Sequence, residues 1–224
     1  MSHAHPHLPS GGRVVEVGGE SPYEISIAAG LLHARPWPDA YNRRMNPSRN
    51  LILVGPMGAG KSSIGQHLAQ RFALRFVDAD ESVEQAAGAS VAQLFEREGE
   101  AGFRLRERAV LAKLLAQDGL VLATGGGAVL DADNRALMKR RGFVVHLQVS
   151  QAQQLARLAD DTSRPLLARA DRAQVLDALA AVRAPLYAQV ADLAFDTDTL
   201  DAAAAAQALG DLLAVQWRSH GVTA

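Results

Sequence analysis

The segment GPMGAGKS, residues 55–62, carries glycines, a lysine and a hydroxyl group at a spacing that suits phosphate binding. It matches the pattern G-x-x-x-x-G-K-[ST], in which backbone N–H groups of a glycine-rich turn surround phosphate oxygens at the start of a helix. Lys61 would bring a positive charge to the β- and γ-phosphates, and the Ser62 hydroxyl would ligate Mg²⁺. The segment therefore predicts a nucleoside triphosphate site and leaves the acceptor open. The residues expected to contact ATP at this turn are Gly58, Ala59, Gly60, Lys61, Ser62 and Ser63.

Two carboxylates follow the next apolar run, in the segment FVDAD at residues 76–80. Asp78 ends an expected strand, and Asp80 lies two residues further on, so both side chains leave the strand end on the same face. Asp78 would hold a magnesium-bound water, while Asp80 would be left to act on an acceptor hydroxyl. The alternative is an acidic turn that merely begins a helix at Glu81.

Three consecutive glycines, residues 125–127, follow the apolar run VLA at 121–123 and Thr124. In a parallel sheet, ligands bind beyond the carboxyl ends of the strands. Residues without side chains would let a small molecule contact backbone amides directly. No lysine or serine follows, which argues against a second nucleotide loop, and a turn that only begins a helix is the alternative.

Two arginines could recognise a carboxylate in the acceptor. Arg104 has Glu107 three residues later on the same helical face, where the acid can orient the guanidinium group. Arg183 stands just before Pro185, which we expect to end its helix. A guanidinium group binds a carboxylate through two parallel hydrogen bonds, so a pair of arginines suits such a ligand. The alternative for each arginine is a solvated surface charge.

The elements that must position these residues are short apolar runs that alternate with amphipathic helical stretches. This alternation predicts an α/β fold with a parallel sheet covered by helices on both faces. A last, alanine-rich stretch at 198–217 is expected to be helical. The expected strands are 51–54, 75–78, 120–123, 143–149 and 192–195.

The composition is that of an ordinary globular protein, with 48% apolar and 21% charged residues among 224. The net charge of −1 gives no general attraction to nucleic acid or to a membrane surface. The absence of cysteine fits a reducing compartment, and no run of about 20 apolar residues could span a bilayer. We therefore expect a cytoplasmic protein without nucleic-acid or membrane partners. We also expect a monomer, although composition and charge do not bear on the oligomeric state.

Residues 1–45 differ from the rest of the chain and contain five of the nine prolines. Two alternating apolar runs around GGESP, within residues 13–32, predict a β-hairpin. We interpret residues 1–45 as a linker-like extension, either disordered or the product of a misassigned start, and residues 46–224 as the functional domain. The alternating histidines of HAHPH, at positions 3–7, fit a disordered tail better than a metal site.

The motifs GPMGAGKS, DAD, GFR, TGGG, RPLL and PLY resemble those of shikimate kinases in order and spacing, over about residues 50–200. The resemblance implies MgATP-dependent phosphorylation of the 3-hydroxyl of shikimate, in the pathway to chorismate and aromatic amino acids. It also implies a P-loop fold of the nucleoside-monophosphate-kinase type, with five parallel strands and a mobile lid at about residues 160–172.

The resemblance further implies a role for each matching residue, with one Mg²⁺ ion bound through Ser62 and, by way of water, Asp78. Asp80 would contact ring hydroxyls and serve as the base, and Arg157 would lie against adenine. Arg164 would reach from the lid to the phosphates. The implied catalytic residues are Lys61, Asp80 and Arg164. The implied shikimate-binding residues are Asp80, Arg104, Gly125, Gly126, Gly127 and Arg183.

Two other functions remain open at this point. A gluconate-type or nucleoside-monophosphate kinase would share the fold, but the first has no need of the two arginines and three glycines, and no nucleobase pocket is evident for the second. A catalytically silent, nucleotide-dependent regulatory subunit is the other alternative. The presence of a complete set of reactive residues argues against it, namely Lys61, Ser62, Asp78, Asp80 and Arg164.

Overall fold

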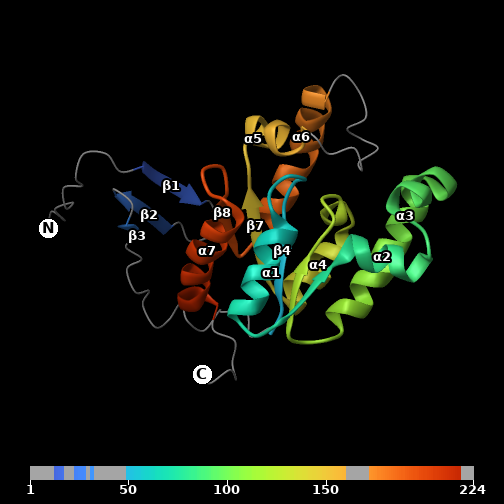
Figure 1. Ribbon diagram of the computed structural model, residues 1–224, viewed down its shortest axis with the longest axis horizontal. Coiled ribbons are helices and arrows are strands. Elements are labelled where there is room, and N and C mark those ends of the chain that lie inside the picture. Colours follow the sequence, from blue (N-terminus) through green and yellow to red (C-terminus); the bar gives the residue numbers. More distant parts are fainter. Residues whose placement is uncertain (1–12, 18–22, 29–30, 33–48, 160–171, 218–224) are drawn as a thin grey trace, which may run out of the picture. The chain divides into compact units, whose positions relative to one another are not determined.

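A computed structural model describes residues 13–17, 23–28, 31–32, 49–159 and 172–217 (Figure 1). The chain divides into two compact units, Met1–Arg44 and Met45–Ala224. The histidines of HAHPH, residues 160–171 of the proposed lid and, among these, Arg164 lie outside the described residues.

The first unit contains an antiparallel sheet in the order β1-β2-β3. Strand β1 (Arg13–Val17) pairs with β2 (Tyr23–Ala28) in a register that runs from Arg13 opposite Ile27 to Val17 opposite Tyr23. The antiparallel pairing confirms the hairpin that the alternating pattern predicts. A short third strand, β3 (Leu31–Leu32), pairs with the end of β2 and was not expected from the sequence.

The second unit is built on a five-stranded sheet in the order β5-β6-β4-β7-β8, with every pairing parallel. The five strands expected from the sequence are all confirmed, with ends shifted by one residue in the last two. Their bounds are β4 Leu51–Val54, β5 Arg75–Asp78, β6 Leu120–Ala123, β7 Phe143–Gln148 and β8 Leu193–Asp196.

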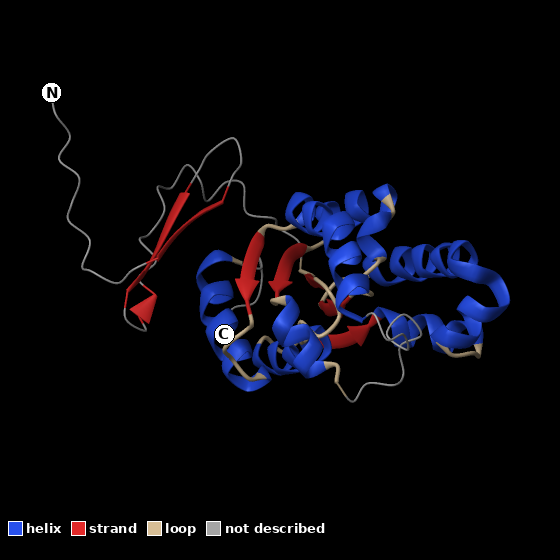
Figure 2. Ribbon diagram, turned by 90° about the horizontal axis from the view of Figure 1, so that it is seen from above, coloured by secondary structure: helices blue, strands red, loops and turns tan. Residues whose placement is uncertain are grey.

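Helices cover both faces of this sheet, as Figure 2 shows. Helices α1 and α7 pack on one face, and α3, α4 and α6 pack on the other. The helix bounds are α1 Lys61–Arg71, α2 Ala79–Ala87, α3 Val91–Leu115, α4 Ala132–Arg141, α5 Gln151–Arg157, α6 Arg172–Val190 and α7 Ala202–Gln216, with a 3₁₀ turn, η2, at Ala128–Leu130.

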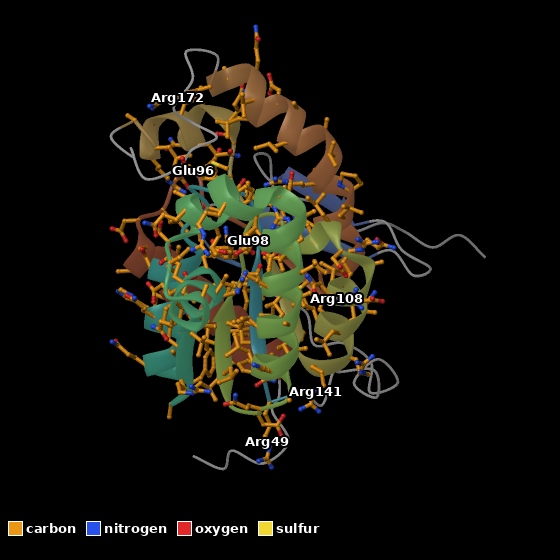
Figure 3. All side chains as sticks on the ribbon, turned by 90° about the vertical axis from the view of Figure 1, so that its right-hand side faces the viewer. Arg49, Glu96, Glu98, Arg108, Arg141 and Arg172 are labelled. Carbon is orange, nitrogen blue, oxygen red and sulfur yellow. The ribbon has the colours of Figure 1, made fainter. Side chains whose placement is uncertain are left out.

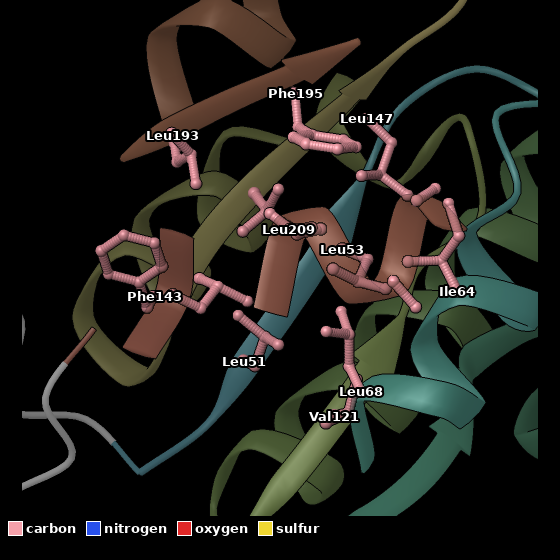
Figure 4. Packing of buried hydrophobic residues seen from close by; sticks show 14 of the residues in the cluster. Leu51, Leu53, Ile64, Leu68, Val121, Phe143, Leu147, Leu193, Phe195 and Leu209 are labelled. Atoms are coloured by element: carbon pink, nitrogen blue, oxygen red, sulfur yellow. The ribbon is translucent and has the colours of Figure 1, made fainter. Parts of the chain in front are cut away.

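The central strand β4 explains why its sequence is apolar throughout. Leu51 and Leu53 point into the core under α1 and α7, where Leu68 and Leu209 meet them (Figure 4). Ile52 and Val54 point into the core on the opposite face. All four side chains of the strand are fully buried, so the run carries no polar residue.

Helix α6 corrects one expectation. We expected Pro185 to end it, yet the helix continues to Val190. Proline cannot donate a backbone hydrogen bond, so the carbonyl of Ala181 loses its usual partner four residues on. Tyr187 and Val190, beyond the proline, are 2% and 0% exposed. Their burial in the core holds the last turn in place.

Candidate active site

The glycine-rich turn lies between β4 and α1, where the sequence motif requires it. Gly55 has φ 145°, and a Cβ atom there would collide with the backbone carbonyl of Leu147 on the neighbouring strand. Gly60, the residue before α1, has φ 86° and offers no side chain to cap the helix. The first N–H groups of α1 therefore lack a capping side chain and can meet an anion.

Lys61 and Ser62 begin α1 and hold the turn to its surroundings. The Lys61 ammonium donates to the carbonyl oxygens of Gly55 and Pro56, each at 2.8 Å. The Ser62 hydroxyl donates to a carboxylate oxygen of Asp78 at 2.7 Å. The predicted metal-binding pair therefore lies together. A hydroxyl and a carboxylate oxygen are hard ligands of the kind that Mg²⁺ prefers, so these two residues fit that ion.

Asp78 also begins the next helix. It is the N-terminal capping residue of α2, and its second carboxylate oxygen accepts from the backbone N–H of Asp80 at 3.0 Å. The alternative of an acidic turn that begins a helix is therefore partly confirmed, since Asp78 caps α2. The contact of Asp78 with Ser62 is compatible with the metal role, which stays a prediction. The helix begins at Ala79 rather than at Glu81.

The three glycines form a turn that side chains from three helices approach. A Cβ atom at Gly125 would lie 2.6 Å from Asp80 Oδ1 of α2. One at Gly126 would lie 3.5 Å from Arg183 Nη1 of α6, and one at Gly127 would collide with the Arg104 guanidinium group of α3. The structure thus brings the predicted acceptor residues together around one turn, which we call the acceptor turn (residues 125–127).

Arg104 is held by a buried acid. Its guanidinium donates to Glu107 at 2.7 Å, as the three-residue spacing predicts, and to Glu100 at 3.2 Å. Burial opposes the charge on Arg104, but Glu107 and Glu100 outweigh that effect, so the pKa of Arg104 is raised. Burial also raises the pKa of Glu107, although Arg104 beside it acts in the opposite direction.

Glu107 belongs to the candidate site in its own right. From the sequence, its only expected role was to orient Arg104. It is 0% exposed, and a Cβ atom at Gly125 would lie 2.8 Å from its Oε1. Within the described residues, that oxygen has no hydrogen-bond partner. A buried carboxylate oxygen without a partner is costly, so it is a ready acceptor for a ligand hydroxyl or water beside Asp80.

Other ion pairs of α3 lie on the surface. Arg106 pairs with Glu98 at 2.7 Å, and Arg108 lies 3.7 Å from Asp131. Figure 3 labels Glu98 and Arg108 on this helix. The Arg106 and Arg108 side chains are 44% and 50% exposed, whereas that of Arg104 is 20% exposed and that of Glu107 1%. Solvent-exposed pairs contribute little to stability. The alternative of a solvated surface charge therefore fits these arginines and not Arg104.

Arg157 lies on the donor side, at the end of α5. Its guanidinium donates to the carbonyl oxygen of Gly58 at 3.0 Å and to the hydroxyl and carbonyl oxygens of Thr197 at 3.1 and 2.5 Å. It therefore joins the glycine-rich turn to the chain that follows β8. Contact with adenine stays a prediction.

Sequence reasoning missed Tyr187 and His146. Tyr187 lies one helical turn after Arg183, and its hydroxyl donates to the carbonyl oxygen of Gly126 at 2.5 Å. Its ring packs on the His146 ring of β7, with centroids 4.9 Å apart. Burial, together with Lys61, lowers the pKa of His146 to about 4. Two signals for Tyr187 were available in the sequence, namely its four-residue spacing from Arg183 and its place in the motif PLY.

A cavity of about 360 Å³ lies beside the glycine-rich turn, between β7, α5 and α6. Its wall includes Met57, His146, Leu176, Arg183 and Tyr187. Asp80, Arg104 and the acceptor turn do not line this cavity, but Arg183 and Tyr187 do, so the cavity adjoins the predicted acceptor site on the α6 side.

A phosphate-binding turn on the central strand of a parallel sheet, with a second set of polar side chains around a separate turn, defines a P-loop kinase of small molecules.

Within the described residues, no helix is long and apolar enough to cross a membrane.

Comparisons with known proteins give the family. The model of the shikimate kinase family matches residues 57–214. A shikimate kinase of Stenotrophomonas maltophilia (strain R551-3) is 58% identical over 180 residues, which are 80% of this chain and 100% of that protein. One from Xanthomonas euvesicatoria pv. vesicatoria (strain 85-10) is 55% identical over 180 residues, again 80% of this chain and 100% of the relative.

A solved structure agrees with these relatives. The shikimate kinase from Acinetobacter baumannii in complex with shikimate has a TM-score of 0.72 and 42% identity, covering 77% of this chain and 97% of that one. This chain belongs to the shikimate kinase family. Because the kinases of this family use ATP, a divalent metal is implied.

Proposed function

We propose that this protein transfers the γ-phosphoryl group of ATP to the 3-hydroxyl of shikimate, giving shikimate 3-phosphate and ADP in the shikimate pathway. The observation that carries this proposal is the acceptor turn, because Asp80, Arg183 and Arg104 each approach one of its three glycines. Two guanidinium groups suit one carboxylate, and a carboxylate beside backbone that carries no side chains suits hydroxyls. The membership of the chain in the shikimate kinase family supports the same assignment.

The donor side would bind ATP through the N–H groups at the start of α1 and through Lys61. Ser62 and Asp78 would hold one Mg²⁺ ion, Asp78 by way of water, and their contact at 2.7 Å supports a shared site. The ion would supply positive charge that neutralises the phosphate oxygens. Arg157 would lie against adenine, which its contacts with Gly58 and Thr197 support.

On the acceptor side, Asp80 would act as the base. The proton of the 3-hydroxyl would pass to the Asp80 carboxylate as the hydroxyl oxygen bonds to the γ-phosphorus. The bond from that phosphorus to the β–γ bridging oxygen would break, and ADP would leave. Lys61 stabilises the charge that develops in this step, and Arg164, which lies outside the described residues, is proposed to do the same.

Arg104 and Arg183 would hold the shikimate carboxylate, while the backbone of the acceptor turn would meet a hydroxyl. The burial of both arginines supports this role, since a guanidinium group kept from water binds a carboxylate more strongly. Glu107 would keep the Arg104 guanidinium in the required orientation. We propose further that the protein acts as a monomer in the cytoplasm and that residues 1–45 take no part in the reaction.

A coupled assay of ADP release tests the proposal. The protein is supplied with ATP and Mg²⁺ and either shikimate, gluconate, AMP or no acceptor, and a Lys61→Ala variant serves as the control. We expect ADP only with shikimate and only from the protein that retains Lys61. Equal release with gluconate or AMP would reopen the substrate class, and release without any acceptor would indicate a nucleotide-dependent regulator instead.

A further inference from the structure

Tyr187 connects two parts of the acceptor site that lie far apart in the sequence. It lies on α6, four residues after Arg183, and the two side chains are 2% and 8% exposed. Its hydroxyl donates to the carbonyl oxygen of Gly126 at 2.5 Å. A Cβ atom at Gly126 would lie 3.5 Å from Arg183 Nη1 and 3.6 Å from the Tyr187 hydroxyl oxygen. The middle glycine therefore lies directly beside both residues.

The carbonyl oxygens of the acceptor turn show what this bond does. Those of Gly125 and Gly127 accept from the backbone N–H groups of Ala128 and Leu130, at 3.1 and 3.0 Å. The carbonyl of Gly126 instead accepts from the Tyr187 side chain. A peptide unit is planar, so fixing the Gly126 carbonyl also fixes the direction of the Gly127 N–H group. Glycine has wide conformational freedom, and without this bond the turn could adopt other orientations.

The helix itself needs such an anchor. Pro185 lies between Arg183 and Tyr187 and removes one backbone hydrogen bond at this point of α6. The turn that carries Arg183 is therefore held less firmly by its own backbone. Tyr187 ties this turn to the acceptor turn through one buried hydrogen bond.

His146 supplies the surface on which Tyr187 rests. The two rings are 4.9 Å apart at their centroids and inclined by 30°. Burial raises the pKa of Tyr187 to about 12, so its hydroxyl remains a donor at neutral pH. Burial lowers the pKa of His146 to about 4, so the ring is neutral and adds no positive charge near Lys61 and Arg183.

We propose that Tyr187, packed on His146, is a positioning residue that fixes the Gly126 peptide and the Arg183 guanidinium group relative to each other for acceptor binding. This inference rests on the proposed function, because shikimate is the acceptor to be bound. Tyr187 acts through Gly126 and Arg183. Because its hydroxyl contacts the acceptor turn, we expect its loss to affect shikimate binding rather than ATP binding.

The substitution Tyr187→Phe tests this role because it removes the hydroxyl and keeps the ring. We expect the KM for shikimate to rise about tenfold, which corresponds to about 1.4 kcal/mol, with the KM for ATP changed by less than about twofold. The matched control is Val190→Ala, on the same helix and in the same apolar cluster. It should lower the melting temperature without raising the KM for shikimate.

A second measurement does not depend on activity. Amide hydrogen exchange of the peptide spanning residues 124–130, in the protein without ligands, should be faster in Tyr187→Phe than in the wild type and in Val190→Ala. Unchanged exchange together with an unchanged KM for shikimate would overturn the inference. Equal rises in both KM values, matched by Val190→Ala, would reduce Tyr187 to a stabilising core residue and overturn it as well.

The two measurements also separate this inference from the proposed function. If the wild type does not phosphorylate shikimate, the proposed function fails, and the exchange experiment still decides whether Tyr187 fixes the acceptor turn. If the wild type is active and Tyr187→Phe is indistinguishable from it, only the positioning role fails. His146→Ala should raise the KM for shikimate in the same direction. A loss of stability alone would remove His146 from the proposal.

Discussion

The donor and acceptor sites of this protein are built in different ways. The donor site is almost wholly one continuous segment, residues 55–63, and its geometry comes from glycines with positive φ such as Gly55 and Gly60. The acceptor site is assembled from α2, α3 and α6 around the acceptor turn. Its residues are up to about a hundred positions apart in the sequence, as Asp80 and Arg183 are. A local site is therefore encoded by backbone conformation, and an assembled site by packing between elements.

This difference leads to different consequences of mutation. A change in the donor segment should affect the reaction with any acceptor, because every turnover uses ATP. A change on one of the three helices should weaken the binding of shikimate and leave the binding of ATP unchanged. Asp80 is the exception, because it belongs to the acceptor site and also takes part in the chemical step.

The largest effects are expected for Lys61→Ala and Asp80→Asn, which should both abolish most turnover by different routes. Loss of Lys61 removes charge from the phosphates and should reduce kcat on the order of 10³-fold. Loss of the Asp80 carboxylate removes the base and should reduce kcat by about 10²–10⁴-fold. Titration with a non-hydrolysable ATP analogue should show weaker binding only in Lys61→Ala. Near wild-type turnover in Asp80→Asn would exclude Asp80 as the base.

Next come Arg104→Ala and Arg183→Ala. Each leaves a partly desolvated carboxylate short of a charged partner, at a cost of about 2–5 kcal/mol. This corresponds to a loss of roughly 30-fold to several-thousand-fold in shikimate affinity. MgATP affinity should hardly change. Calorimetric titrations with shikimate and with an ATP analogue measure both quantities. A parallel fall in ATP affinity would show that the arginines serve the fold or the donor site.

The same difference decides what could be predicted from the sequence. The five strands and the donor turn were predicted because apolar runs and a contiguous motif are local signals. The chemistry of Arg104 and Arg183 suggested a shared carboxylate, and the resemblance to a family strengthened that prediction. Nothing local in the sequence indicates that α3 and α6 meet at the acceptor turn. Pro185 misled the prediction of the helix end, because burial of Tyr187 and Val190 outweighs one lost hydrogen bond.

His146 lies between the two sites, close to Lys61 and stacked on Tyr187, and provides a pH test of their shared core. Its pKa falls from 6.5 to about 4 on folding, so the folded protein binds fewer protons than the unfolded chain between these values. The neutral His146 ring therefore contributes to the free energy of unfolding above pH 6.5. This contribution, at most about 3 kcal/mol, is lost as the pH falls towards 4.

The variant His146→Phe keeps an aromatic ring and cannot be protonated, so its loss of stability on acidification should be smaller by a similar amount. Urea denaturation at pH 7, 5.5 and 4.5 measures this difference. Parallel curves of unfolding free energy against pH would show that His146 keeps its ordinary pKa in the folded protein. This result would contradict its burial.

The smallest effect is expected outside both sites. A protein beginning at Met45 lacks residues 1–44, whose described part is a β-hairpin with a third strand of only two residues. A hairpin of this kind is marginally stable by itself. We expect its melting temperature to lie within about 2 °C of the full chain and its kcat to be unchanged. A drop of several degrees in differential scanning calorimetry would show that the segment stabilises the kinase unit.

The central claim is that the acceptor turn presents the 3-hydroxyl of shikimate to the phosphate held at the donor turn. Phosphorus NMR of the reaction mixture, with proton coupling to locate the ester, tests it most directly. The account predicts one new phosphomonoester signal, coupled to the proton on C3 of shikimate and equal in amount to the ADP formed. Inorganic phosphate in its place, or an ester on another hydroxyl, would contradict the account.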